Sequence, residues 1–223
     1  MLGANAWQNQ YEMSLEFHDL GAELALLCGN FEEMENFVET VIAKANSLLE
    51  KVYVYRIRIQ ANISHNKLSE AICIAKQILQ QLGITFPDTP TREDIQNNIA
   101  EIGSMIGDRE IEDLVYLPIM TEAEKIAIIK IVNSVMTAAF ISGSTLYPLL
   151  VAFSVKLSIQ YWNTEASAHA YIAYAVSACI NQDVVAGVKF GHLALELVAK
   201  LNAKTVKSQV ISVLGSFILH RNS

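Results

Sequence analysis

Candidate chemistry in the sequence centres on one short run, Glu16-Phe17-His18-Asp19-Leu20. A solvent-facing histidine followed by an acidic residue can accept a phosphoryl group, because the carboxylate can assist as a base. Here Gly21-Ala22 replaces the basic and proline residues that usually follow such a histidine, and His18 falls on the apolar stripe of its predicted helix. We therefore interpret His18 as a packed side chain and keep a phosphoacceptor role as an alternative.

The remaining residues with catalytic or metal-binding potential do not form a recognisable site. No His-Glu-x-x-His or Cys-x-x-Cys spacing brings ligands around one zinc ion. Gly187 and Gly191 belong to no phosphate-loop pattern and are interpreted as helix-crossing positions. No serine lies in a nucleophile elbow. The sequence thus predicts no catalysis, no cofactor and no metal. The scattered histidines are His65, His169, His192 and His220.

Helices must position any functional side chain, because helical periodicity dominates the sequence. Apolar residues from Leu68 to Leu82 follow the i, i+3, i+4, i+7 spacing of one helical face, and Asn66 can cap that helix. The preceding residues 52–59 alternate like a strand, yet a helical stripe crosses them from Leu48 without a turn signal. We therefore predict that this stretch is a helical hairpin.

The hairpin pattern occurs in two further copies. An earlier pair covers residues 8–27 and 31–49 and turns at Gly29-Asn30, and a later pair surrounds Asn181-Gln182-Asp183. Between the first two copies, the inner positions of the second helices repeat at a constant offset of thirty-seven residues. These inner positions are Phe31, Met34, Val38, Val41 and Ile42 in the first copy, Leu68, Ala71, Ala75, Ile78 and Leu79 in the second, and Val184, Gly187, Gly191, Ala194 and Leu195 in the third.

Composition agrees with a helical fold throughout. The 223 residues are 52% hydrophobic and include only four prolines and ten glycines, which favours an all-α protein over a sandwich or barrel. We expect a single domain over residues 1–223, built of antiparallel helical hairpins stacked as a right-handed α-solenoid. Further helices are predicted up to Met105 and Ile141, behind capping boxes at Thr91/Asp94 and Thr121/Glu124, and over residues 144–161, 165–180, 184–201 and 205–219.

The three hairpins resemble tetratricopeptide repeats. Their pattern is an aromatic or large residue, a small residue, a turn, and then Gly-Asn-Phe or an equivalent followed by Ala-rich positions. The terminal proline of the repeat signature is missing. The signature tryptophan corresponds to His18, Tyr55 and Tyr171, and its small position to Ala22, Ile59 and Ala175.

Over almost its whole length the chain is also similar to the helical segment of large cyanobacterial-type multi-domain signalling kinases. In that family the segment follows serine/threonine kinase and NTPase modules and precedes sensor and histidine-kinase modules. The resemblance implies a non-catalytic regulatory segment and transfers no functional residues. It is carried by LCGNFEEME, SHNKLSEAICIAKQILQQLGITFPDTPT, IEDLVYLPIMTEAEKIAI and YWNTEASAHAYIAYA.

Charge and hydropathy restrict the possible partners and compartment. Sixteen basic against twenty-three acidic residues give a net charge of −7, which disfavours nucleic acid. The uncharged residues 131–155 are long enough for a membrane span, but helix-stop and helix-start residues interrupt them, so we expect two buried helices and no membrane. Cys28, Cys73 and Cys179 are odd in number and predicted to be buried, reduced thiols, which favours the cytoplasm.

The strongest predicted functional feature is a surface for a protein partner or for neighbouring modules of the same chain. In solenoids, the first helices of successive hairpins line a concave groove. The groove candidates are Tyr53, Arg56, Arg58, Asn62 and Tyr171.

Two further expectations concern the second half of the chain. An alternative function is that of a small-ligand sensor, with an apolar pocket among the poorly charged helices of residues 131–180.

The last predicted helix carries an apolar face without a following cap, so we expect a fragment of a longer protein and self-association through that face. The face consists of Val210, Val213, Leu214, Phe217 and Ile218.

Overall fold

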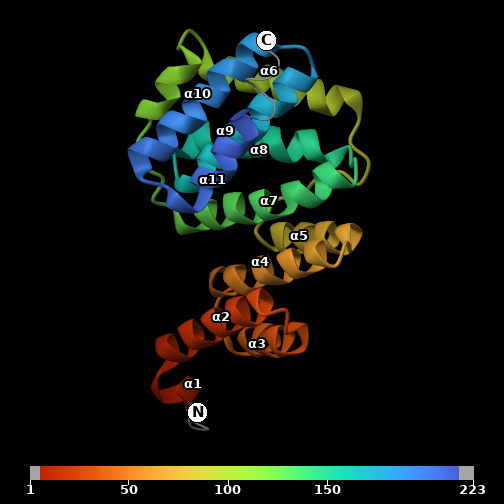
Figure 1. The fold of residues 1–223 in the computed structure, drawn as a ribbon, viewed down its shortest axis with the longest axis vertical. Helices are drawn as coiled ribbons and strands as arrows, with labels where there is room; N and C mark the ends of the chain where they lie inside the picture. The colour runs from red at the N-terminus through yellow and green to blue at the C-terminus, as the bar shows by residue number, and fades with distance from the viewer. Residues whose placement is uncertain (1–5, 216–223) are drawn as a thin grey trace. The chain divides into compact units, whose positions relative to one another are not determined.

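The computed structural model describes residues 6–215, and every regular element within this range is a helix (Figure 1). One isolated bridge joins Ile119 to Asn163 outside the helices. The all-α prediction is therefore confirmed. The chain divides into two compact units, Met1–Thr85 and Phe86–Ser223, which are described separately below.

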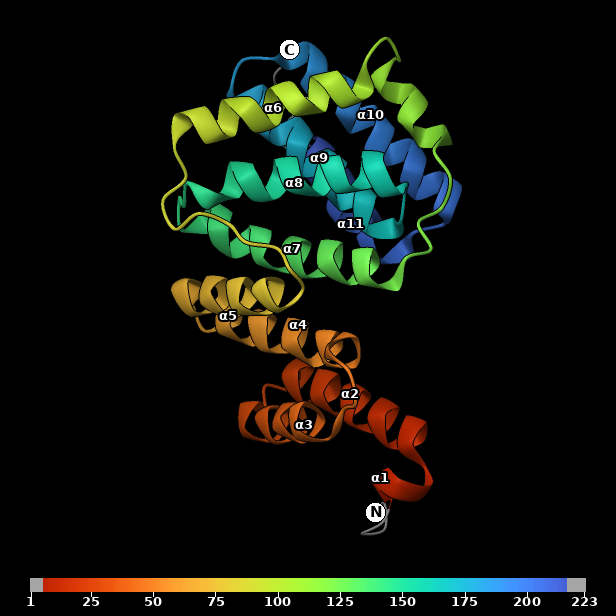
Figure 2. The ribbon, with the colours of Figure 1, turned by 180° about the vertical axis from the view of Figure 1, so that it is seen from behind.

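Unit 1, drawn from red to gold in Figure 2, consists of two antiparallel helical hairpins behind a short first helix. Residues 52–59 lie within a helix, as predicted, because Ser47 and Glu50 form a reciprocal capping box at its start. The preceding helix ends at Lys44, earlier than predicted. The elements are α1 (Ala6–Asn9), α2 (Tyr11–Leu27), α3 (Phe31–Lys44), α4 (Leu48–Ser64) and α5 (Leu68–Gln81).

Both hairpins of unit 1 close with the same backbone turn. Gly29 and Asn66 adopt left-handed φ angles of 73° and 58°. The Asn66 N–H donates to the Ile63 carbonyl at 2.9 Å, and the next N–H, of Lys67, donates to the Asn62 carbonyl at 2.8 Å, which is a Schellman motif. Asn66 therefore ends α4, whereas the sequence predicted that its side chain would cap α5.

The inner faces of the hairpins are buried at equivalent positions. Met34 and Val38 in α3, and Ala71 and Ala75 at the same places in α5, are all less than 9% exposed. In unit 1, buried residues of α2, α3 and α4 form one apolar cluster. Its buried members are Ala22, Ala25, Met34, Val38, Val41, Val54, Ile57 and Ala61.

Unit 2 packs its remaining helices around α8 and α9, which are buried on most sides. In both ribbon views α8 lies between α6 and α7, and it contacts both of them and α9 (Figures 1 and 2). The elements are α6 (Arg92–Ile106), the 3-10 helix η1 (Ile111–Tyr116), α7 (Ala123–Ile141), α8 (Leu146–Tyr161), α9 (Glu165–Ile180), α10 (Val184–Leu201) and α11 (Lys204–Val213).

Several local predictions can be compared with these elements. The uncharged stretch 131–155 is split between α7 and α8, as expected, and none of the helices within residues 6–215 is long and apolar enough to cross a membrane. The predicted capping box at Thr91 forms. The one at Thr121 does not, because α7 begins after Glu122 without a side-chain cap.

Two other predictions concern the cysteines and the chain end. Cys179 is buried, but Cys28 and Cys73 are exposed, so the prediction of burial is wrong for these two thiols. Cys28 follows the last turn of α2 and is exposed there. In the predicted C-terminal face, Val210 is buried, while Phe217 and Ile218 lie outside the described residues.

Close packing of α9 against α10 depends on Gly187. A Cβ atom at this position would lie 2.3 Å from the Cys179 Sγ atom and 3.1 Å from the Ala175 carbonyl oxygen. Gly187 occupies the same repeat position as Met34 and Ala71, so the third hairpin uses the smallest residue where the first uses a large one.

We predict that Gly187→Ala lowers the free energy of unfolding by about 1–3 kcal/mol, because overpacking outweighs the better helix propensity of alanine. Gly103→Ala is the matched control, since its Cβ would meet nothing within 4 Å, and it should stabilise by about 0.5–1 kcal/mol. Urea unfolding of both variants provides the measurement. Equal effects of the two substitutions would contradict this packing.

Candidate functional site

The five predicted groove residues are divided between the two units. Tyr53, Arg56, Arg58 and Asn62 lie on α4, whereas Tyr171 lies on α9. Tyr171 is fully enclosed, and its hydroxyl donates to the Asn163 Oδ1 atom at 2.8 Å. Burial raises its pKa above the ordinary value, so the hydroxyl stays protonated. Tyr171 therefore offers no surface to a partner.

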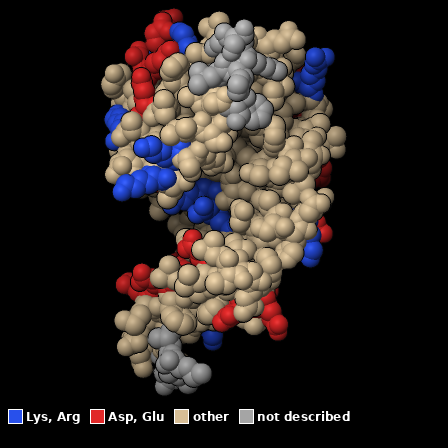
Figure 3. Space-filling view, in the orientation of Figure 1, with Lys and Arg blue, Asp and Glu red and all other residues tan. Residues whose placement is uncertain are grey.

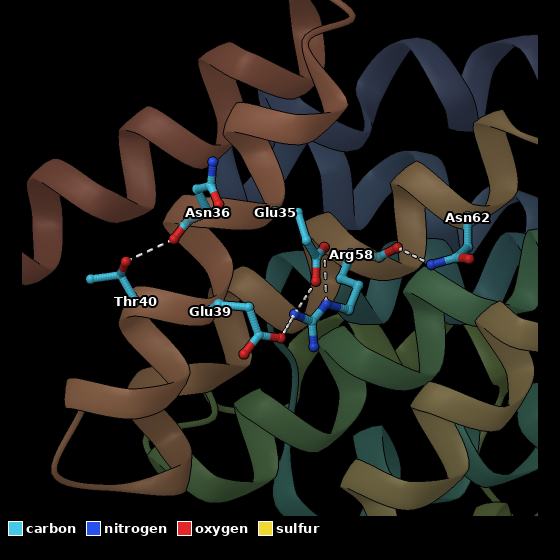
Figure 4. A network of polar contacts seen from close by, with 6 residues as sticks. All are labelled: Glu35, Asn36, Glu39, Thr40, Arg58 and Asn62. Atoms are coloured by element: carbon cyan, nitrogen blue, oxygen red, sulfur yellow. Dashed lines mark hydrogen bonds and ion pairs between the residues drawn. The ribbon is translucent and has the colours of Figure 1, made fainter.

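Arg58 connects α4 to α3 (Figure 4). Its guanidinium pairs with the carboxylates of Glu35 and Glu39, and only 17% of the Arg58 side chain is exposed. Asn62 donates from Nδ2 to the Arg58 carbonyl oxygen at 2.9 Å, within the same helix. Two carboxylates neutralise this half-buried guanidinium, so Arg58 and Asn62 serve the packing of the unit.

Tyr53 and Arg56 face acidic side chains of α2. The Tyr53 hydroxyl donates to the Glu23 Oε2 atom at 2.6 Å. Burial, assisted by this hydrogen bond and by the Glu23 charge, raises the pKa of Tyr53 to about 12. Arg56 is half-buried, and the Glu23 charge partly offsets the loss of hydration that lowers its pKa.

Asp19 belongs to the same polar group, although the sequence did not indicate it. Its Oδ1 atom is enclosed and accepts no hydrogen bond within the described residues. Burial raises the pKa of this carboxyl to about 6, because loss of hydration disfavours the charged form. Its charge also contributes to the raised pKa of Tyr53. Asp19, Glu23, Tyr53 and Arg56 thus form one polar surface across α2 and α4.

His18 packs among aromatic rings. Its ring centroid lies 5.0 Å from that of Trp7 and 5.7 Å from that of Phe37. The Nδ1 atom lies 2.6 Å from the Ser14 carbonyl oxygen, and because a carbonyl only accepts, Nδ1 carries the proton. The ring is therefore half-buried with one nitrogen engaged.

The most unusual surface of unit 1 is an apolar stripe on α2, which we call the α2 stripe. Its side chains are between 49% and 76% exposed, and they recur at alternating intervals of four and three residues along the helix. Such spacing places them on one face, opposite the face on which Ala22 and Ala25 are buried. The members of the α2 stripe are Met13, Phe17, Leu20, Leu24 and Leu27.

Acidic residues border the α2 stripe along one edge. Glu12, Glu16 and Glu23 are exposed, and α2 contains no lysine or arginine. On the face drawn in Figure 3, unit 1 shows a largely uncharged surface with acidic side chains around it. The signal for this face in the sequence is the set of leucines at positions 20, 24 and 27, which lie away from the buried Ala22 and Ala25.

In the second repeat, the face of α4 that corresponds to the α2 stripe is covered by the preceding hairpin. At an offset of thirty-seven residues, Phe17, Leu20 and Leu24 correspond to Val54, Ile57 and Ala61 of α4. These three α4 residues are 0%, 7% and 4% exposed, and they pack in the cluster with α2 and α3. The same face is therefore covered by the preceding hairpin in the second repeat and uncovered in the first, within the described residues.

No metal site accompanies this surface, since residues 6–215 contain no group of three histidine, cysteine or acidic side chains able to hold an ion. Comparisons of the chain with protein-family models, with curated proteins and with solved structures find no match.

We predict that Asp19→Asn stabilises the protein at pH 7 by about 1 kcal/mol, after allowance for partial solvent screening. The raised folded pKa means that Asp19 favours folding only when it is protonated, so its contribution is present below its ordinary pKa of 3.8 and is lost as the pH rises through about 6. The gain should therefore vanish near pH 4.

Urea midpoints of the wild type and Asp19→Asn at both pH values provide the measurement. Glu16→Gln removes an exposed carboxylate from the same helix and should leave the midpoint at pH 7 nearly unchanged. A gain for Asp19→Asn that persists at pH 4 would rule out the titration of Asp19 as its cause.

Proposed function

We propose that this chain is a non-catalytic protein-interaction or signal-relay segment, and that the α2 stripe is its docking surface for an amphipathic helix. The observation that carries the proposal is the set of five large apolar side chains exposed on one face of α2. A contiguous exposed apolar patch on a protein surface marks an interaction site more often than apolar residues exposed singly do.

The spacing favours a helix as the partner. Apolar residues that alternate at intervals of four and three form the seam into which a second helix inserts its own side chains. The seventeen residues of α2 extend about 25 Å at 1.5 Å per residue. A partner helix of similar length would bury a small area, which is typical of transient contacts in signalling.

Charge favours a basic partner helix. Glu12 and Glu16 have no basic neighbours within α2, whereas Glu23 already accepts from Tyr53 and lies near Arg56. Lysines or arginines beside the apolar seam of the partner would meet these carboxylates, which speeds encounter and selects orientation. A second copy of α2 would instead bring like charges together when the two helices run antiparallel.

The finer parts of the proposal rest on the sequence resemblance. We propose that the hairpins of unit 1 stack as a tetratricopeptide-like right-handed solenoid, and that the segment belongs to a cytoplasmic multi-domain signalling kinase. The alternative of phosphoryl acceptance by His18 has less support, because the ring is packed and its Nδ1 atom is engaged.

We predict that a labelled helical peptide of about three heptads, with leucine at the seam positions and lysine or arginine beside them, binds this chain. Leu20→Ser together with Leu24→Ser should weaken binding at least about tenfold, since each loses part of the roughly 1.5–3 kcal/mol of a buried leucine. Val185→Ser, at a residue 71% exposed on α10, is the matched control and should not change binding. Fluorescence anisotropy measures the affinities.

A second peptide with glutamate beside the seam tests the role of charge. It should bind at least about tenfold more weakly than the basic peptide at low salt, and the difference should shrink as salt screens the acidic edge. Equal binding of the basic peptide to the stripe variant (Leu20→Ser with Leu24→Ser) and to the control variant (Val185→Ser) would contradict docking on the α2 stripe. Light scattering that shows a dimer, lost in the stripe variant, would identify a second copy as the occupant instead.

A further inference from the structure

Unit 2 contains an apolar pocket that the proposed function does not use. It has a volume of about 140 Å³ and lies between α7, α8, α9 and α11. No charged side chain lines it, so a bound ion would find no counter-charge. Its walls include Phe140, Tyr147, His169, Ile172, Val176 and Val213.

His169 gives this apolar pocket a polar group without a partner. The ring is one of the walls, its Nδ1 atom is enclosed, and no residue within the described range accepts from it or donates to it. Burial lowers the pKa of His169 to about 4, so the ring is neutral at pH 7 and offers one donor and one acceptor. Enclosed polar groups without partners are few in native proteins, and leaving one unsatisfied costs about 1–3 kcal/mol.

Aromatic side chains define the shape of the pocket beside His169. The rings of Phe140 and Tyr147 lie 5.1 Å apart between centroids at 59° to each other. Burial raises the pKa of Tyr147 to about 12, so its hydroxyl is neutral as well. A flat ring packs well against such a tilted pair. Apolar cavities of about 150 Å³ in other proteins take up a molecule the size of benzene.

We propose that this pocket binds a small neutral aromatic alcohol of a single ring, with the ring against Phe140 and Tyr147 and the hydroxyl hydrogen-bonded to the imidazole of His169. Such a ligand matches the volume and the absence of charged side chains, and its hydroxyl would meet the imidazole at Nε2, because Nδ1 is enclosed. It would contact four helices of unit 2 at once and so stabilise the folded state by mass action. The inference is independent of the α2 stripe.

Phenol and toluene are the probes, because they have nearly the same shape and differ in the hydroxyl. We expect both to raise the melting temperature of the full chain, and phenol to bind about fivefold more tightly by titration calorimetry, as one net hydrogen bond would give. His169→Phe should abolish this preference while toluene still binds. His192→Phe, at an exposed histidine of α10, is the matched control and should retain the preference.

Val176→Trp provides an independent check, since the larger side chain should fill the pocket and remove binding of both probes. Equal affinities of phenol and toluene for the wild type would overturn the role of His169. No shift in melting temperature with either probe at millimolar concentration would overturn the site itself, as would unchanged binding in Val176→Trp.

Discussion

In each repeated hairpin, the turn between the two helices contains one residue in the left-handed backbone region. Gly29, Asn66 and Gln182 have φ angles of 73°, 58° and 68°, and the N–H groups that follow bind the free carbonyls of the last helical turn. The turn is so short that the two helices must run antiparallel, which fixes which residues face each other. Residues as different as Met34, Ala71 and Gly187 are therefore buried at equivalent places.

This fixed register explains why one face of unit 1 remains apolar and exposed. The face that α4 buries against the preceding hairpin is the face that α2 presents as the α2 stripe. Stacked repeats bury such a face against their neighbour, and within the described residues no preceding hairpin covers it on α2. In unit 2, α8 and α9 are apolar on nearly all sides and are buried accordingly, and the candidate binding site there is a pocket among the helices.

Local signals made much of the fold predictable. The ends of α9 and α10 match the predicted residues because Thr164 and Asp183 are caps and Gln182 sits at a short polar turn. The helix over residues 52–59 was also predictable, because the helical spacing of apolar residues from Leu48 onward outweighed the strand propensity of these residues. The candidate site was less predictable. Pairing of Arg58 with Glu35 and Glu39, or of Tyr171 with Asn163, depends on which helices meet, and periodicity within one helix does not encode that.

The proposed docking of a basic amphipathic helix on the α2 stripe is tested most directly by methyl NMR of the methionines. Met13 is 59% exposed within the stripe, while Met34 and Met136 are 3% and 2% exposed. On titration with the basic peptide, the Met13 methyl signal should shift or broaden and the signals of Met34 and Met136 should change little. An unchanged Met13 signal, with shifts at Met136, would contradict the account.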